Sequence, residues 1–165
     1  MTTPLDAILS FLDAIGIPSR PAELPEGTFL PAVAIDAGPL VYDPQRLRWP
    51  GDLLHEAGHI AVTPPAARAG LSGALEGSEA APHGGEVEAI AWSWAAAMHL
   101  GLAPQELFHP DGYKGQSAGL LLSYSLGVWP GAFGLAQAGM TLVGETAQEA
   151  GVPPYPRMRA LLRPS

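Results

Sequence analysis

The sequence predicts an α+β fold that is mainly helical, in which a small N-terminal β-hairpin or sheet lies beside two long helices. Apolar residues recur at helical spacing in residues 4–15, 51–62 and 85–100. Two short apolar runs, 29–35 and 40–42, flank the turn-forming segment 36–39 and predict the hairpin. At 165 residues the chain suits one compact domain, so we expect residues 1–165 to form a single domain.

Residues 4–15 predict a short amphipathic helix. Gly16 follows at a position where helices commonly end, and three prolines between residues 18 and 25 indicate an irregular connection to the hairpin. The apolar face of this helix carries Leu5, Ile8, Leu9, Leu12 and Ile15.

Two longer helices are predicted in the middle of the chain. The first follows Pro50 and ends before Pro64, with Asp52 in its first turn, where the helix dipole favours a negative charge. The second runs from about residue 85 to 100 and ends before Gly101. The segment between them is rich in Ala, Gly, Pro and Ser, and we expect a loop with one helical turn at most.

The stretch between Lys114 and Glu145 contains no charged residue, so its length requires a test as a membrane span. Glycines and Pro130 interrupt it, and no basic residues cluster at its ends. Two buried helices joined by a turn at 127–131 explain it better. A polar stretch and a last helix through Leu162 are expected to complete the chain.

The charge and the missing cysteines exclude several classes of function. With 16 acidic and 8 basic residues the net charge is -8, and we expect no nucleic-acid partner because phosphate binding requires a basic surface. The chain has no Cys, which excludes thiolate metal ligands and cysteine nucleophiles. No Lys or Arg precedes Arg20, whereas a secretory signal starts with basic residues, so we expect a cytoplasmic protein.

The segment His-Glu-Ala-Gly-His at residues 55–59 carries the clearest chemical signal. His55 and His59 are four residues apart on the predicted helix, so both imidazoles project from one face and can bind one metal ion. Their neighbours are apolar, so the helix is expected to be largely buried. Two His and a Glu on a buried helix indicate a specific role, because burying polar side chains without partners is costly. The alternative is a pair of surface or hydrogen-bonded core histidines.

Glu56 is the candidate general base. Its carboxylate can take a proton from a metal-bound water that attacks a peptide carbonyl, and can pass it to the leaving amine. This is the arrangement of the zincin metallopeptidases, so the sequence predicts a zincin-like core and Zn²⁺ as the cofactor.

A zinc site of this kind needs a third protein ligand. The candidates are Glu86 and Glu88, which open the second long helix and point in nearly opposite directions. We favour Glu88, because Ala91 and Ala95 on its face would let this helix pack closely against Gly58. The face of Glu86 is only slightly less suitable, and Glu86 is otherwise expected to stabilise the start of its helix.

Four more side chains are candidates for orienting a ligand or for donating a hydrogen bond to the oxyanion of the reaction. Each also has an ordinary explanation in a helix start, a loop or a turn. They are Asp52, His83, His109 and Tyr113.

Three segments resemble the ImmA/IrrE-type metallopeptidases. They are Leu-Val-Tyr-Asp at 40–43, the His-Glu-Ala-Gly-His helix, and Glu-Ala at 88–89 with Trp92 after it. Those proteins place a strand before an HExxH helix and take a glutamate ligand from a later helix. The resemblance implies a gluzincin-like site in which His55, His59 and Glu88 hold the metal and Glu56 is the base.

These patterns predict a minimal zinc-dependent metallopeptidase that acts on a peptide or protein substrate. The alternative is a metal-binding regulatory or scaffold protein that has the zincin core without proteolysis. A third hypothesis, association with a membrane through the uncharged stretch, is not expected because glycines and proline interrupt that stretch.

Overall fold

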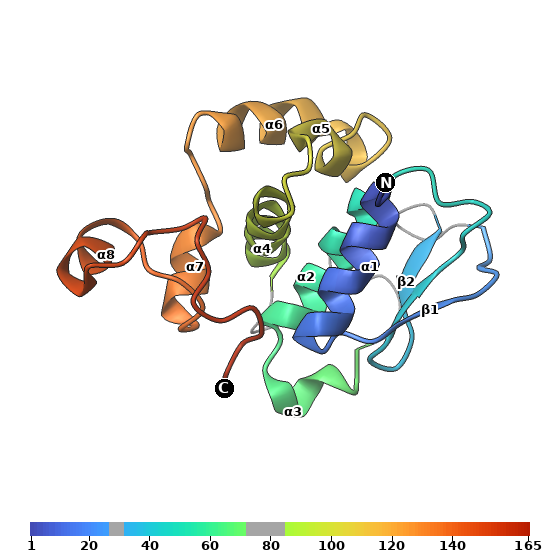
Figure 1. The fold of residues 1–165 in the computed structure, drawn as a ribbon, viewed down its shortest axis with the longest axis horizontal. Helices are drawn as coiled ribbons and strands as arrows, with labels where there is room; N and C mark the ends of the chain where they lie inside the picture. Colours follow the sequence, from blue (N-terminus) through green and yellow to red (C-terminus); the bar gives the residue numbers. More distant parts are fainter. Residues whose placement is uncertain (27–31, 72–84) are drawn as a thin grey trace.

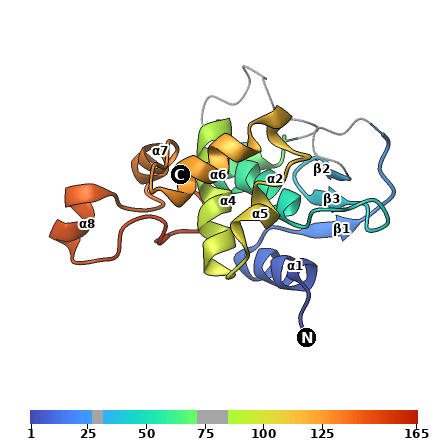
Figure 2. The ribbon, with the colours of Figure 1, turned by 90° about the horizontal axis from the view of Figure 1, so that it is seen from above.

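The computed structural model describes residues 1–26, 32–71 and 85–165, and its elements lie in successive layers. In chain order they are α1 (Pro4–Ile15), β1 (Ser19–Pro21), β2 (Val33–Ile35), β3 (Leu40–Tyr42), α2 (Gly51–Val62), α3 (Pro65–Arg68), α4 (Glu86–His99), α5 (Pro104–Leu107), the 3₁₀ helix η1 (Tyr113–Gly115), α6 (Ser117–Ser125), α7 (Ala132–Gln137) and α8 (Gly144–Ala150). From one side to the other the layers are the sheet, then α1 with α2, then α4, α7 and α8 (Figure 1, Figure 2). The predicted α+β class is confirmed.

The N-terminal helix α1 has the bounds that its apolar spacing predicts. The Thr3 side chain accepts a hydrogen bond from the backbone of Asp6, and the Asp6 carboxylate accepts one from the backbone of Thr3, which closes a capping box. Gly16 ends the helix in the left-handed region with φ 88°. The apolar face packs into the core, where Ile8 and Leu12 are fully buried.

The small sheet has β3 in its centre, with β2 antiparallel on one side and β1 parallel on the other. β2 and β3 form the predicted hairpin, in which Ile35 pairs with Leu40. Residues 29–31, expected to begin this strand, lie outside the described residues. β1 was not predicted, because Pro18 and Pro21 indicated an irregular connection. The carbonyl of Pro18 nevertheless accepts a hydrogen bond from the backbone N–H of Leu40 in β3. This bond uses the carbonyl of the proline, so the N–H group that proline lacks is not needed for it.

Helix α2 lies at the centre of the molecule and has the predicted bounds. All of its residues are buried, because α1, the sheet and α4 pack around it. Its apolar side chains Leu53, Leu54 and Ala57 are fully buried. Any polar side chain on α2 is therefore held inside the protein and needs polar partners there.

Gly58 lets α4 approach α2 closely, as expected. A Cβ atom added at Gly58 would lie 2.6 Å from the carbonyl oxygen of Ala89, so the backbones of the two helices are too near for a side chain. This contact fixes which face of α4 meets α2.

Replacing Gly58 with alanine is therefore expected to destabilise the protein by about 1–3 kcal/mol, despite the better helix propensity of alanine. Gly119→Ala is the matched control, because Gly119 is also helical and a Cβ there meets nothing within 4 Å. Urea denaturation of both variants measures the difference. Equal stability of the Gly58 variant and the native protein would contradict the close approach.

The uncharged stretch forms the two predicted helices, α6 and α7, joined by a turn at 127–131. The expectation that both are buried is wrong in part, since Leu122 of α6 is 63% exposed and Phe133 of α7 is 65% exposed. Within residues 1–26, 32–71 and 85–165, no helix combines the length and hydropathy that a membrane span needs.

The predicted last helix through Leu162 is wrong. A helix, α8, forms earlier, and the chain after it runs without helix to the C-terminus. Backbone groups of this segment form hydrogen bonds with other elements. The carbonyl of Leu161 accepts a hydrogen bond from Trp92 Nε1, and the backbone N–H of Arg163 donates one to the carbonyl of Ala61. Tertiary hydrogen bonds thus replace the helical ones that the local sequence favours.

Candidate metal centre

Two histidines of α2 face the start of α4 from inside the protein. His55 is fully buried and His59 is 3% exposed. One helical turn separates them, so their rings lie 5.0 Å apart between centroids, at 82° to each other. The spacing in the sequence therefore brings both imidazoles to one point, as predicted.

Glu86, the first residue of α4, completes the group. Its Oε1 lies 3.4 Å from Nε2 of His55, and its Oε2 lies 3.1 Å from Nε2 of His59. The three potential ligand atoms lie within 4.8 Å of one another. The Glu86 side chain is 36% exposed, so this group opens to solvent on the side of α4.

The expectation that Glu88 faces the histidines is wrong. Its carboxylate points toward α7, where a Cβ atom at Gly134 would lie 2.7 Å from Glu88 Cγ. The reason is the rotation of α4 about its own axis, which the close contact of Gly58 with Ala89 determines. Ala89 faces α2, and Glu86 lies one turn before Ala89 on the same face of α4. The face of Glu88 instead packs against α7 and the C-terminal segment, through Ala91 among others.

The electrostatics of the group favour a cation between the three side chains. Burial acts to raise the pKa of Glu86, but its contacts with His55 and His59 outweigh burial and hold that pKa well below its ordinary value. Burial acts to lower the pKa of His55, yet the negative charges of Glu86, Glu56 and Asp52 raise it overall. Charges that attract a proton to this place also attract a metal ion, which competes with protons for the same atoms.

The donor set fits Zn²⁺. Two imidazole nitrogens and one carboxylate oxygen are ordinary zinc ligands, and three protein ligands leave one position of a tetrahedral ion open. Ligand atoms about 2.0–2.1 Å from a tetrahedral zinc lie about 3.3 Å from each other. The separations of 3.4 and 3.1 Å between the Glu86 oxygens and the two Nε2 atoms are close to that spacing.

Glu56 lies beside the two histidines and is 3% exposed. Burial raises the pKa of its carboxyl, although the charges of His55 and His59 act to lower it. Among the described residues its Oε2 atom has no hydrogen-bond partner. A buried carboxylate with a free oxygen next to a candidate metal group can accept a proton there.

Tyr113 contacts the group from the side of η1. Its ring meets that of His55 edge-on, with centroids 5.1 Å apart at 89°, and its side chain is almost fully buried. Over the described part of the chain the Tyr113 hydroxyl has no hydrogen-bond partner. Its backbone adopts the left-handed region with φ 56°, a conformation that costs about 1–3 kcal/mol and persists where surrounding contacts impose it.

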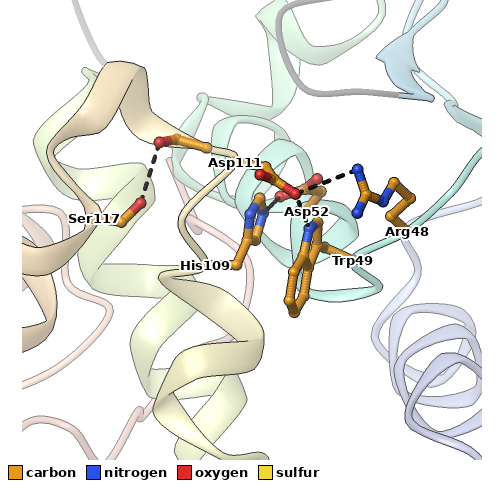
Figure 3. A network of polar contacts seen from close by, with 7 residues as sticks. Arg48, Trp49, Asp52, His109, Asp111 and Ser117 are labelled. Carbon is orange, nitrogen blue, oxygen red and sulfur yellow. Dashed lines mark hydrogen bonds and ion pairs between the residues drawn. The ribbon is translucent and has the colours of Figure 1, made fainter.

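A second polar cluster lies at the first turn of α2 (Figure 3). His109 Nε2 lies 2.5 Å from Oδ1 of Asp52, and both residues are buried. Trp49 stacks on the His109 ring at 4.7 Å and donates a hydrogen bond from Nε1 to Asp111, which also pairs with Arg48 at 3.6 Å (Figure 3). The cluster ties the start of α2 to the turn that carries Tyr113.

Removing His109 is expected to destabilise the protein strongly. His109→Ala leaves the Asp52 carboxylate buried without its partner, at a cost of about 3 kcal/mol or more. The double variant Asp52→Ala/His109→Ala should lose less than the sum of the two single variants. Arg48→Ala is the matched control, because the Arg48–Asp111 pair is exposed and contributes about 0–1 kcal/mol. Guanidinium denaturation measures all four, and additive losses would contradict the pairing.

The remaining sequence candidates fall in different places. His83 lies outside the described residues. Asp52 and His109 pair with each other, and Tyr113 contacts His55. Sequence reasoning missed Trp49, Arg48 and Asp111, because no local pattern links a stacking Trp to a His 60 positions later.

Comparisons with known proteins give no relative from which a role could be transferred, since no family model, no curated protein and no solved structure matches the chain. The chemical interpretation therefore rests on the three side chains of the candidate metal centre and their neighbours.

Proposed function

We propose that this protein is a zinc-dependent peptidase with a zincin-like core. The observation that carries the proposal is the convergence of His55, His59 and Glu86 from two helices, with Glu56 buried beside them. A stability role alone does not explain why the protein gathers two buried imidazoles, the buried Glu56 carboxylate and the partly exposed Glu86 carboxylate in one place.

His55, His59 and Glu86 would hold the metal. Zinc, when bound, supplies Lewis acidity that polarises a peptide carbonyl and lowers the pKa of a water molecule. The exposed side of Glu86 supports an approach of substrate from solvent over the first turn of α4.

Glu56 serves as the proton carrier in this proposal. Its buried carboxylate accepts a proton from the attacking water and delivers it to the nitrogen of the leaving amine. The Oε2 atom supports this role, since no described residue forms a hydrogen bond with it.

Tyr113 is the side chain best suited to donate a hydrogen bond to the oxyanion. Its hydroxyl is buried next to the metal centre and lacks a partner among the described residues. His109 is less suited, because its Nε2 atom is already engaged by Asp52. One well-placed donor of this kind is commonly worth about 3–4 kcal/mol in the transition state.

The resemblance to the ImmA/IrrE-type metallopeptidases belongs to this proposal. The order of strand β3, helix α2 and a later helix with a glutamate near the histidines agrees with that arrangement. The Glu-Ala pair at 88–89 does not support it, because Glu88 points toward α7.

Zinc removal and return test the function. Protein stripped with a chelator is expected to show no hydrolysis of a quenched-fluorescent peptide library, and one equivalent of Zn²⁺ should restore it. Circular dichroism of the stripped protein checks that the fold survives. Tight zinc binding with no hydrolysis of any peptide would contradict the peptidase and favour the regulatory or scaffold alternative.

A further inference from the structure

A cavity of about 480 Å³ lies between the C-terminal end of α4 and the chain segment 154–161, which follows α8. Helix α4 contributes side chains at three- and four-residue spacing, which therefore lie on one face, and these are Ala95, Met98 and His99. The opposite wall consists of two prolines together with Arg157, Met158 and Leu161. The volume is in the range of cavities that hold a small organic molecule, about 300–1,000 Å³.

This cavity is separate from the metal centre. Glu86 is the first residue of α4 and His99 is the last, so about 20 Å of helix lies between the two places, at about 1.5 Å per residue. A ligand in the cavity is therefore held by a set of side chains that the metal centre does not use.

The C-terminal segment is fixed at both ends of the cavity. The Tyr155 hydroxyl donates a hydrogen bond of 2.9 Å to the carbonyl of Ala91, and Trp92 Nε1 donates one of 2.8 Å to the carbonyl of Leu161. Tyr155 is 1% exposed and Trp92 is fully buried, so both anchors belong to the core. Because α4 holds the segment at these two points, the cavity is part of the fold and does not have to be opened by a ligand.

The cavity combines apolar walls with a positive charge at its solvent side. Ala95 is buried, whereas His99 and Arg157 are exposed. Among the described residues, no acidic side chain lines the cavity, and the Arg157 guanidinium has no hydrogen-bond or ion-pair partner. In a chain of net charge -8, this arrangement leaves a cation beside an apolar cavity without a carboxylate to neutralise it.

We propose that this cavity binds a small amphipathic carboxylate, with its apolar body between α4 and the C-terminal segment and its acid group on Arg157. A guanidinium presents a planar pair of N–H donors that matches the two oxygens of a carboxylate. His99 can add a donor from its ring. A cationic ligand would be repelled by Arg157, and a neutral one would leave the guanidinium without a partner. This binding does not depend on the proposed peptidase function.

NMR of isotope-labelled methionine methyl groups tests the proposal on the intact chain. Of the four methionines, Met98 and Met158 line the cavity, whereas Met1 and Met140 do not. The probe is phenylbutyrate. Phenylbutyramide has the same apolar body without the charge, and acetate has the charge without the body. Phenylbutyrate is expected to shift the Met98 and Met158 signals alone, and to bind at least about 5-fold tighter than either control compound.

Two arginine variants test the role of the charge. Arg157→Gln should remove the advantage of phenylbutyrate over phenylbutyramide and leave the affinity for the amide unchanged. Arg159→Gln is the matched control, because Arg159 is also exposed and its loss changes the net charge equally, but its side chain does not line the cavity. Phenylbutyrate should bind to this variant with nearly its native affinity.

Several results would overturn the proposal. They are equal affinity for phenylbutyrate and its amide, equal affinity for phenylbutyrate and acetate, equal losses in the two arginine variants, and shifts at Met1 or Met140 in place of Met98 and Met158. The absence of any shift at millimolar phenylbutyrate would also contradict it.

Discussion

Glu56→Gln is expected to lower the rate of peptide hydrolysis by about 10²–10⁴-fold, the usual contribution of a general base. Glutamine keeps the shape of the side chain but cannot accept the proton. Because Glu56 is 3% exposed and burial already opposes its charge, the neutral side chain should fit the same place without loss of stability. The measurement is kcat for a peptide substrate, with zinc content determined on the same sample.

The zinc content separates this prediction from a simple loss of metal. Bound zinc should stay near one equivalent in Glu56→Gln, and thermal unfolding should be unchanged. Hydrolysis at the native rate by the zinc-loaded variant would show that the proton is carried by another group.

Glu86→Ala is expected to weaken zinc binding by about 100-fold or more, because loss of a direct ligand should exceed the 10–100-fold effect of losing a supporting contact. Its oxygens lie 3.4 and 3.1 Å from the two histidine nitrogens, and among the described residues it is the carboxylate that completes the group of potential ligands. Competition with a chromophoric chelator measures the affinity.

Glu88→Ala is the matched control, since it removes the same chemical group two residues away on the same helix. Its carboxylate faces α7, and its zinc affinity is expected to stay within about 3-fold of the native value. A large loss in Glu88→Ala with none in Glu86→Ala would restore the assignment that the sequence alone favoured.

The sequence was sufficient for the elements whose signals are local. Helix α2 has the predicted bounds because prolines precede its first turn and follow its end, and His55 and His59 converge because a four-residue spacing on a helix leaves little freedom. The hairpin of β2 and β3 follows from two apolar runs and one turn.

The choice between Glu86 and Glu88 needed information that one helix does not contain. Both open α4, and each shares its face with small or apolar side chains. The contact of Gly58 with Ala89 decides the phase of α4, and that contact forms only when two helices distant in sequence meet. The glycine in the middle of α2 predicted that another helix approaches closely at Gly58. It did not predict which face of α4 would make this contact.

Long-range contacts also explain the errors at the C-terminus. Residues 157–162 have a composition that suits a helix, but Leu161 accepts a hydrogen bond from Trp92 and the carbonyl of Arg163 accepts one from Arg68. The pairing of Asp52 with His109 likewise spans 57 positions. None of these contacts leaves a periodic signal in the sequence.

Zinc titration of the metal-free protein tests the central claim most directly. The native protein is expected to bind one Zn²⁺ per chain, and His55→Ala/His59→Ala should bind none in the same range, with circular dichroism to confirm that both are folded. X-ray absorption of the loaded native protein should show two imidazole ligands and one carboxylate. A folded double variant that binds zinc as tightly as the native protein would contradict the metal centre.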